Sequence, residues 1–478
     1  MKKICIIIFL LLSIEHYCEG KIKLPAILSS HMVLQQQTNV ELWGWGDVGK
    51  TITIKPSWNN KSYETSVLSD GTWSIDITTI EAGGPYTISF NDGETIELTD
   101  VYLGEVWLCS GQSNMEMPVK GYLGQPVLNS TATIANADSE LPVRLFTVEK
   151  KPSKDMLEDC NGKWRLNNSE SVAEFSATAY FFGLQLYKSL KVPIGLVHSS
   201  WGGSVIQAWM PAKTLHNFPE ISQTHLTEST EIKKPNSVAS MLYNGMIHPI
   251  KNMTFRGVIW YQGESNRYNP KQYELLFPIF VKAWRSVFRN TNLPFCYAQI
   301  APYSYKNSNA VTGALIREVQ YKCEKMIPNV AMAVLMDSGD ETCIHPANKK
   351  IAGQRLAYLA LHHVYDQKAI PANSPRFSSK QSKGKKLILS FDNAPDGITS
   401  YGKPLELFEI AGADNVFYPA KARIINRSKV EVWSPKVEEP QEVRYAFKNF
   451  TTGDLFGVNG LPVSSFRTDS LDLSQESK

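Results

Sequence analysis

Apolar and polar residues alternate with a period of two near both ends of the chain. The alternating segments are residues 40–45, 51–54, 71–77 and 86–90 on the amino side and 386–391, 422–425, 429–433 and 443–447 on the carboxyl side. Turn sequences rich in Gly, Asn and Asp separate them, which is typical of β-strands in small sandwiches. The pattern therefore predicts an N-terminal β domain over residues 21–104 and a C-terminal β-sandwich-like region over residues 385–470.

Between these flanks, over residues 105–370, apolar strands alternate with helical segments. We expect strands at 104–108, 192–198, 255–261, 295–300 and 330–336, and helices at 177–190, 273–288, 314–326 and 346–365. A helix between successive strands is the connection that neighbouring parallel strands need. The sequence therefore predicts an α/β domain with a mainly parallel sheet, whose last helix carries Pro346 in its first turn.

The first twenty residues have the pattern of an export signal. Lysines at positions 2 and 3 precede an apolar run over residues 4–14, and small residues follow at Cys18 and Gly20. The run is too short for a membrane span, which needs about 20 apolar residues. Glu-His-Tyr directly precedes Cys18, which argues against a lipid anchor there. We expect signal cleavage near Gly20, export to the periplasm or the extracellular space, and no membrane span.

The composition of the 478-residue chain is that of a folded protein, with 43% hydrophobic and 20% charged residues. Its 49 Lys and Arg against 46 Asp and Glu leave a net charge of +3. No basic tract is interleaved with aromatic residues, so we expect no nucleic-acid partner. Beyond the signal, cysteines remain at positions 109, 160, 296, 323 and 343, without a CxxC pair. We expect buried free thiols, at most two disulfides and no zinc site.

Four polar motifs follow predicted strands of the α/β region, at the edge where open α/β sheets bind ligands. They are Ser-Gly-Gln-Ser-Asn-Met at 110–115, Ser-Trp-Gly-Gly-Ser at 200–204, Gln-Gly-Glu-Ser-Asn at 262–266, and Asp-Ser-Gly-Asp-Glu-Thr-Cys-Ile-His-Pro at 337–346. Taken alone, each is explained equally well by a helix cap or a tight loop. Four of them at one sheet edge indicate a single site.

Together the motifs supply the parts of an acyl-transfer site. Ser113 suits the nucleophile and His345 its general base. Gly203 allows backbone N–H groups to approach an oxyanion closely, and Gln262 offers a side-chain N–H for the same purpose. An acid behind the histidine completes such a site, and Glu264 is one acid that can orient a histidine.

These motifs resemble those of the SGNH (GDSL-like) hydrolase superfamily, and within it the sialate O-acetylesterase family of carbohydrate esterases. The resemblance runs from near Leu24 to Thr468 and includes Met-Val-Leu-Gln at 32–35 and Asn-Gly-Leu-Pro at 459–462. It implies a flavodoxin-like catalytic domain flanked by β domains. It also implies a serine esterase that hydrolyses O-acetyl esters on sialic acids without a cofactor or metal.

The acid departs from the family pattern. The superfamily usually has Asp three residues before the histidine, and many sialate esterase relatives have it two residues before. Those positions are Thr342 and Cys343 here. Three alternatives stay open: Glu264, as in a related acetylxylan esterase family; Asp340; and a Ser–His dyad oriented by a backbone carbonyl. Gln262 stands where many relatives of the superfamily have an Asn donor.

The substrate stays open as well. A sialate site needs a cation for the sugar carboxylate, and Arg267, directly after the third motif, is our candidate. The nearest alternative is the same reaction on another acetylated glycan such as acetylated xylan, because the motifs report the reaction and not the sugar. An alternative from another class is a non-catalytic carbohydrate-binding protein that kept the fold. The sequence carries no signal for the oligomeric state.

Overall fold

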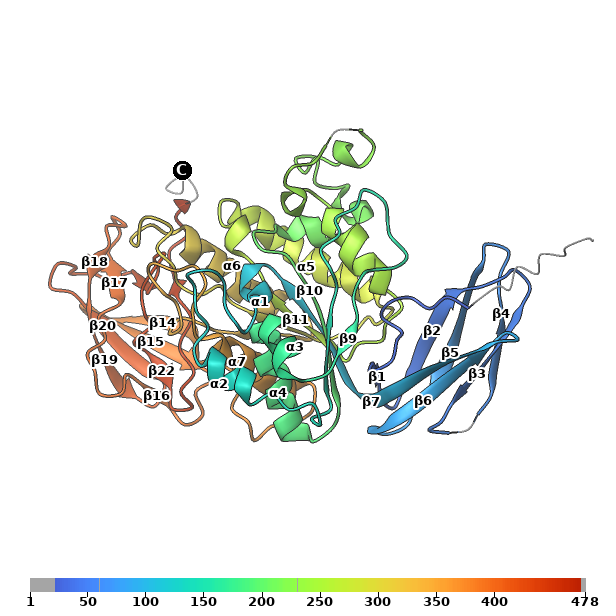
Figure 1. Ribbon diagram of the computed structural model, residues 1–478. Coiled ribbons are helices and arrows are strands. Elements are labelled where there is room, and N and C mark those ends of the chain that lie inside the picture. Colours follow the sequence, from blue (N-terminus) through green and yellow to red (C-terminus); the bar gives the residue numbers. More distant parts are fainter. Residues whose placement is uncertain (1–21, 60, 230, 474–478) are drawn as a thin grey trace, which may run out of the picture.

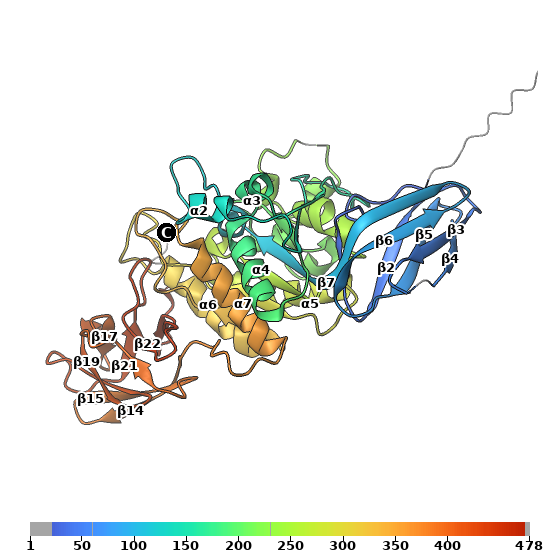
Figure 2. The ribbon, with the colours of Figure 1, turned by 60° about the horizontal axis from the view of Figure 1, so that its bottom comes forward.

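Three regions follow one another along the molecule, as the computed structural model shows (Figures 1 and 2). The structure describes residues 22–59, 61–229 and 231–473. A β region lies at one end, an α/β region in the middle and a second β region at the other end. The predicted export signal, residues 1–20, lies outside the described residues. Within the described part of the chain, every helix is too short or too polar to cross a bilayer.

The N-terminal region consists of β-strands whose apolar residues pair across the sheet. Its strands are β1 (Val33–Gln35), β2 (Asn39–Trp45), β3 (Thr51–Pro56), β4 (Tyr63–Ser66), β5 (Thr72–Thr78), β6 (Gly83–Asn91) and the first part of β7 (Thr95–Gly111). Buried Val40 lies opposite Ile77, and buried Ile54 opposite Phe90. The period-two alternation therefore predicted β2, β3, β5 and β6, whereas β1, β4 and the first part of β7 were not predicted from it.

Strand β7 belongs to two regions at once. Its first part pairs antiparallel with β6, and its last part lies between two parallel strands of the central sheet. Residues 103–111 are buried at every position, whereas the residues before them include exposed positions. The boundary expected at residue 104 therefore falls inside one continuous strand, with no linker between the two regions (Figure 1).

The central sheet has the order β13-β12-β11-β7-β10-β8-β9. Its further strands are β8 (Val143–Thr147), β9 (Trp164–Arg165), β10 (Ile194–Ser200), β11 (Gly257–Tyr261), β12 (Phe295–Ala298) and β13 (Val330–Ala333). All of these strands pair parallel to their neighbours except β9, which is antiparallel to β8. The predicted α/β class with a mainly parallel sheet is confirmed. The chain changes direction across the sheet on the two sides of β7, which makes its carboxyl end the expected place for a ligand.

Helices cover both faces of this sheet (Figure 2). They are α1 (Ser113–Glu116), α2 (Ser130–Ala135), α3 (Ser169–Glu174), α4 (Ala177–Leu190), α5 (Pro270–Val287), α6 (Thr312–Met326) and α7 (Lys349–His363). Helix α4 packs against α7, and α5 packs against α6. On β7, Trp107 and Cys109 join the core under α4 and α7, while Val106 and Leu108 join the core under α5 and α6. Burial on both faces explains why the strands have continuous apolar runs.

The last helix of the α/β region starts later than predicted. We expected Pro346 in its first turn, but α7 begins at Lys349, after the N-cap residue Asn348. The carbonyl oxygen of Ala347 accepts a hydrogen bond from a neighbouring loop and another from the N–H of Lys349, which holds this segment outside the helix. The prediction was wrong in a detail that affects the site, because His345 lies on the segment before the helix.

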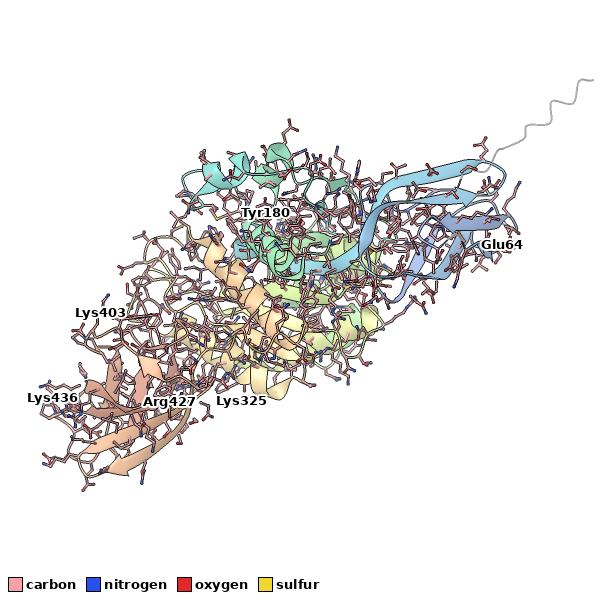
Figure 3. The ribbon with its side chains drawn as sticks, turned by 90° about the horizontal axis from the view of Figure 1, so that it is seen from below. Glu64, Tyr180, Lys325, Lys403, Arg427 and Lys436 are labelled. Atoms are coloured by element: carbon pink, nitrogen blue, oxygen red, sulfur yellow. The ribbon has the colours of Figure 1, made fainter. Side chains whose placement is uncertain are left out.

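The C-terminal region consists of three small antiparallel sheets. Its strands are β14 (Arg376–Lys383), β15 (Lys386–Asp392), β16 (Ile398–Thr399), β17 (Phe408–Ala411), β18 (Tyr418–Pro419), β19 (Lys421–Asn426), β20 (Lys429–Trp433), β21 (Glu442–Tyr445), β22 (Phe456–Gly457) and β23 (Phe466–Arg467). Leu389 and Val430 pair in its core, while Lys403, Arg427 and Lys436 are exposed (Figure 3). A second β region is therefore present, but it begins with β14 at Arg376, before the predicted start at residue 385.

The cysteines of the described residues are all free thiols, and only Cys343 is not buried. Burial raises the pKa of the other thiols, among them Cys296 to about 12. Such thiols are protonated at neutral pH and pack as small apolar side chains. The expected buried thiols are thus observed, and none of the described cysteines forms a disulfide.

Candidate functional site

The first motif turns sharply at the end of β7 and places Ser113 at the start of α1. Gly111 has a φ of +146°, and a Cβ atom there would lie 2.2 Å from the carbonyl oxygen of Tyr261 on the adjacent strand. Only glycine fits so closely against a neighbouring backbone. Among the described residues the Ser113 hydroxyl has no hydrogen-bond partner, so this side chain is not used to hold the turn together.

The loop after β10 lies against Ser113. A Cβ atom on Gly202 would lie 3.4 Å from the Cβ of Ser113. The Gly202 N–H donates to the Glu116 carboxylate, and its carbonyl oxygen accepts a 2.8 Å hydrogen bond from the Asn236 amide. Gly203 is exposed, with φ at +70°, and its N–H is the only one of residues 201–204 without an acceptor in the described structure. An unpaired backbone donor thus lies in the loop beside the candidate nucleophile.

Gln262 braces this loop rather than facing an open site. Its amide nitrogen donates to the carbonyl oxygen of Ser204 at 3.1 Å and to Oδ1 of Asn266 at 2.7 Å, in a fully buried position. Both amide hydrogens are therefore used within the protein. In this structure Gln262 does not offer a donor to an oxyanion, because its hydrogens hold together the loops after β10 and β11.

Asn114 is the centre of a buried polar network that joins three loops. Its Nδ2 donates to Oε1 of Glu264 at 2.7 Å and to the carbonyl oxygen of Ile344 at 3.1 Å. Its Oδ1 accepts a hydrogen bond from Nζ of Lys349. Each of the three polar side chains is at most 3% exposed. The network connects the turn after β7, the loop after β11 and the start of α7, and it fixes the residue before His345.

His345 is held by two contacts from one hairpin, residues 121–125. Its Nδ1 lies 2.5 Å from Oε1 of Gln125, and its ring packs edge-on against Tyr122 with 5.4 Å between ring centroids. The ring is half-buried. Within the described residues the other ring nitrogen, Nε2, has no hydrogen-bond partner, so it is free to accept a proton.

Neither carboxylate considered as the triad acid orients His345 in this structure. Oε1 of Glu264 accepts from the buried network, and its Oε2 has no hydrogen-bond partner among the described residues. Asp340 is exposed and accepts from two N–H groups of its own loop. A backbone carbonyl does not take this place either, because the acceptor is the side-chain amide of Gln125. The sequence analysis had not considered an amide here.

Arg267 lies at the edge of the site between two aromatic rings. Its guanidinium centre is 4.1 Å from the ring centroid of Tyr268 and 4.4 Å from that of Tyr305. It donates to the carbonyl oxygen of Glu264 at 2.9 Å and to the Tyr268 hydroxyl. The Tyr268 side chain is 64% exposed. A fixed cation with an exposed aromatic neighbour therefore adjoins the third motif.

Burial and charge set the protonation states in the site. Burial, together with the Lys349 ammonium, lowers the pKa of His345 to about 4. Burial lowers the pKa of Lys349 to about 7, against the attraction of the Glu264 carboxylate. Burial raises the pKa of Glu264. His345 is therefore neutral at pH 7 and able to act as a base.

Several residues around the site were missed by the sequence analysis. They are Glu116, Tyr122, Gln125, Asn236 and Lys349. Glu116 follows Ser113 by three residues within α1, so helical spacing would have pointed to it. Lys349 is the first residue of α7 and His345 lies before that helix, so no such spacing pointed to the lysine. The other three lie in loops without any local signal.

The arrangement suits acyl transfer. The segments that carry a serine hydroxyl and a neutral imidazole are joined by the hydrogen bond from Asn114 to Ile344, and an unpaired backbone N–H lies in the loop beside the serine. In the part of the chain that the structure describes, no three His, Cys, Asp or Glu side chains are grouped so that they could hold a metal ion. The chemistry that these side chains themselves offer is nucleophilic attack on an ester.

Comparison with known proteins assigns the site to an enzyme class. Residues 103–362 match the family model described as carbohydrate esterase, sialic acid-specific acetylesterase. The match includes every site residue described above, so the protein is a carboxylic ester hydrolase of the carbohydrate esterase class. The chain belongs to the family of sialic acid-specific acetylesterases.

Named relatives support the same family. The sialate O-acetylesterase of Homo sapiens is 31% identical over 388 residues, covering 74% of this chain and 73% of the relative. That of Mus musculus is 30% identical over 412 residues, covering 74% and 75%. A solved carbohydrate acetylesterase from Xanthomonas citri is 33% identical, with a TM-score of 0.86, covering 94% of this chain and all of that one. Membership of an enzyme family sets aside the alternative of a non-catalytic binding protein.

Proposed function

We propose that this protein is a serine esterase of the SGNH type that removes O-acetyl groups from sialic acids. The observation that carries the proposal is that Asn114, the residue after Ser113, hydrogen-bonds the carbonyl oxygen of Ile344, the residue before His345, while the glycine loop at 202–203 lies against Ser113. The human and mouse sialate O-acetylesterases support the choice of sugar. Leaving out β8 and β9 at one side of the sheet, the five remaining strands lie in the order β10-β7-β11-β12-β13. In chain order this is 2-1-3-4-5, the flavodoxin-like order, which supports the SGNH assignment.

The proposed reaction passes through an acetyl-serine. Nε2 of His345 takes the proton of Ser113 Oγ while that oxygen attacks the acetyl carbonyl carbon. The N–H groups of Gly203 and Ser113 stabilise the resulting oxyanion. The bond to the sugar oxygen then breaks, and His345 donates its proton to the departing hydroxyl. Water, deprotonated by the same nitrogen, attacks the acetyl-serine, releases acetate and restores the hydroxyl of Ser113.

We further propose that the enzyme acts after export, in the periplasm or outside the cell. The support is the sequence pattern of two lysines, an apolar run over residues 4–14 and small residues near position 20.

A second substrate class is favoured by one observation. The Xanthomonas citri protein that shares the fold over 94% of this chain is described as acting on carbohydrate, without mention of sialate. We therefore propose an acetylated sialic acid as the first candidate substrate and another acetylated glycan as the second. Arg267 distinguishes them, because only the sialate has a carboxylate for it to bind.

Acetate release from three substrates tests this choice. The substrates are 9-O-acetylated N-acetylneuraminic acid, acetylated xylan and an aryl acetate, and we expect the highest kcat/KM on the sialate. The Arg267→Met variant should lower kcat/KM on the sialate by about 10- to 100-fold, as expected for one charge-assisted hydrogen bond, and by less than about threefold on the aryl acetate.

Arg289→Met is the matched control, because Arg289 is 68% exposed and pairs with Glu41 on the surface. It should leave all three substrates unaffected. Release chiefly from xylan would reject the sialate and keep the reaction. Equal losses on sialate and aryl acetate in Arg267→Met would remove this arginine from the sugar site.

The pH dependence of the reaction should reflect the neutral histidine. The base acts in its unprotonated form, and the pKa of His345 is lowered to about 4. We therefore expect kcat/KM on an aryl acetate to be constant from pH 8 down to about pH 5 and to fall below that, rather than near the ordinary histidine value of about 6.5. A half-point above pH 6 in a pH–rate profile would contradict this prediction.

A further inference from the structure

The histidine of this site lacks the carboxylate that usually orients a catalytic imidazole. The residues two and three positions before His345 are Cys343 and Thr342, which carry no acid. The Nδ1 atom instead lies 2.5 Å from Oε1 of Gln125, close enough for a short hydrogen bond. An amide oxygen only accepts, so Nδ1 must carry the proton and Nε2 the lone pair. This is the tautomer that a base facing Ser113 requires.

The hairpin that carries Gln125 is built to hold its position. The N–H of Tyr122 donates to the carbonyl oxygen of Gln125 at 3.0 Å, and the reverse hydrogen bond has the same length. Gly121 has a φ of +85°, and a Cβ atom there would lie 2.6 Å from the carbonyl oxygen of Gln125. The backbone of Gln125 is therefore fixed on both sides, and its side chain reaches the histidine from a short, closed turn.

The same hairpin also contacts the loop that carries the unpaired N–H. The Tyr122 hydroxyl hydrogen-bonds the Glu116 carboxylate, whose other contacts are the N–H of Gly202 and, at 2.7 Å, Nζ of Lys150. The Tyr122 ring packs against His345. The positions of the base and of the glycine loop are thus set by one element.

We propose that Gln125 is the positioning residue of His345, taking the place of the triad acid through the hydrogen bond from Nδ1 to its amide oxygen. The proposal rests on the proposed esterase function of Ser113 and His345. A neutral acceptor fixes the tautomer and the ring orientation, and it adds no negative charge to stabilise the imidazolium. The hairpin around residues 121–125 is therefore part of the catalytic apparatus without touching the reacting atoms.

Other charged and titratable groups also surround the histidine, and the test must separate them from Gln125. They are Lys349 on α7, Glu116 behind Tyr122, Glu264 behind the backbone of Ile344, and Cys343 on the same segment. None of them hydrogen-bonds the imidazole ring in the described structure. A change confined to the acceptor atom at position 125 therefore tests the proposed contact and leaves those groups in place.

The experiment compares Gln125→Met, Gln125→Glu and the control Gln185→Met in the full-length enzyme. Gln185 is a half-buried glutamine on α4 whose amide oxygen accepts from Gln354, away from the site. Gln125→Met should lower kcat on an aryl acetate by about 10- to 100-fold with KM unchanged, since one hydrogen bond is lost and the imidazole is free to change tautomer. Gln185→Met should leave kcat unchanged.

Gln125→Glu keeps an acceptor for Nδ1 of His345 and should therefore retain kcat, and its pH profile is a second measurement of the contact. A carboxylate beside the ring favours the charged imidazolium, so the acidic limb of kcat/KM should move to higher pH, while kcat at pH 8 stays at or above the wild-type value. NMR of isotope-labelled histidine should show a proton fixed on Nδ1 of His345 in the wild type and a tautomer mixture in Gln125→Met. If Gln125 only stabilised the fold, its replacement would change neither the pH at which kcat/KM falls nor the tautomer of His345.

Two outcomes would overturn the proposal. One is an unchanged kcat and tautomer in Gln125→Met, and the other is an equal loss of kcat in Gln125→Met and Gln125→Glu with wild-type melting temperatures. Failure of the proposed function looks different, because the wild-type enzyme would then show no release that depends on Ser113. The NMR readout of the resting enzyme still tests the contact between Gln125 and His345 in that case.

Discussion

Replacing Ser113 by alanine should abolish the esterase reaction and leave the fold intact. The hydroxyl is the proposed nucleophile, and removal of a nucleophilic serine from a serine hydrolase costs about 10⁴- to 10⁶-fold in kcat. The fold should be unaffected, because the hydroxyl has no hydrogen-bond partner among the described residues. The measurement is acetate release from an aryl acetate and from acetylated sialate, with a thermal melt of each variant.

The matched control is Ser110→Ala, three residues earlier and near the end of β7. Ser110 is fully buried and its Oγ also lacks a partner in the described structure, so both activity and melting temperature should stay at the wild-type values. In the wild type, mass analysis of the quenched reaction should find one acetyl group on the peptide that contains Ser113. Activity above about one per cent in Ser113→Ala would exclude this serine as the nucleophile.

The order of strands and helices was predictable from the period of the hydrophobic pattern. Helix α4 begins and ends at the predicted residues, 177 and 190: the Ser176 side chain caps its start by accepting from the N–H of Ala179, and Lys191 ends it in a left-handed conformation. Strand β8 was missed, because Arg144 interrupts its short apolar run. That arginine is buried, and it donates to the carbonyl oxygen of Leu141 and to the carboxylate of Asp100, contacts that no local sequence pattern indicates.

The candidate site was predictable only where the chemistry depends on one residue in a recognisable motif. Ser113 and His345 belong to motifs that follow strands, so sheet topology brings them to the same edge. Gln125 is 220 residues from the histidine that it contacts, and glutamine in a loop carries no signature. Gln262 was assigned to the site from its position in the motif, yet its amide hydrogens are used by the protein itself.

Buried charge links these separate motifs. Asn114, in the turn after β7, bonds at once to Glu264 in the loop after β11 and to Lys349 at the start of α7. Disturbing a buried polar network is costly, because a polar group left without a partner has lost its hydration without a hydrogen bond in return. We therefore infer that the network holds the nucleophile turn and the histidine segment together, and that its loss should affect stability and activity alike.

Removing the cation from this network should destabilise the protein strongly. In Lys349→Met the apolar stem is retained, while Asn114 Oδ1 loses its donor and the buried Glu264 carboxylate loses its nearest opposite charge. A buried polar group left unpaired costs about 1 to 3 kcal/mol, and the buried Glu264 carboxylate also loses a compensating charge. We therefore expect a loss of about 3 kcal/mol in the free energy of unfolding at pH 6, measured by urea titration, because Lys349 has a pKa of about 7 and is largely charged at pH 6. Lys120→Met, which breaks an exposed pair with Glu174, should cost less than about 1 kcal/mol.

The pH dependence of this loss has a definite sign. Without Lys349 the pKa of Glu264, already raised by burial, rises further in the folded state. A carboxyl whose pKa is higher in the folded than in the unfolded state stabilises the native state at pH values below its unfolded-state pKa. This contribution is lost as the pH rises through its folded-state pKa. The deficit of Lys349→Met should therefore be smaller at pH 5 than at pH 6, and Glu264→Gln added to it should recover part of the loss at pH 6. Both pH values lie below the Lys349 pKa of about 7, so the lysine stays largely charged in the wild type throughout this comparison. The acidic limb of kcat/KM should move above pH 4, because the positive charge that lowers the pKa of His345 is gone. A stability loss equal at both pH values, with no recovery in the double variant, would show that Lys349 acts by packing alone and that the charge does not connect the three loops.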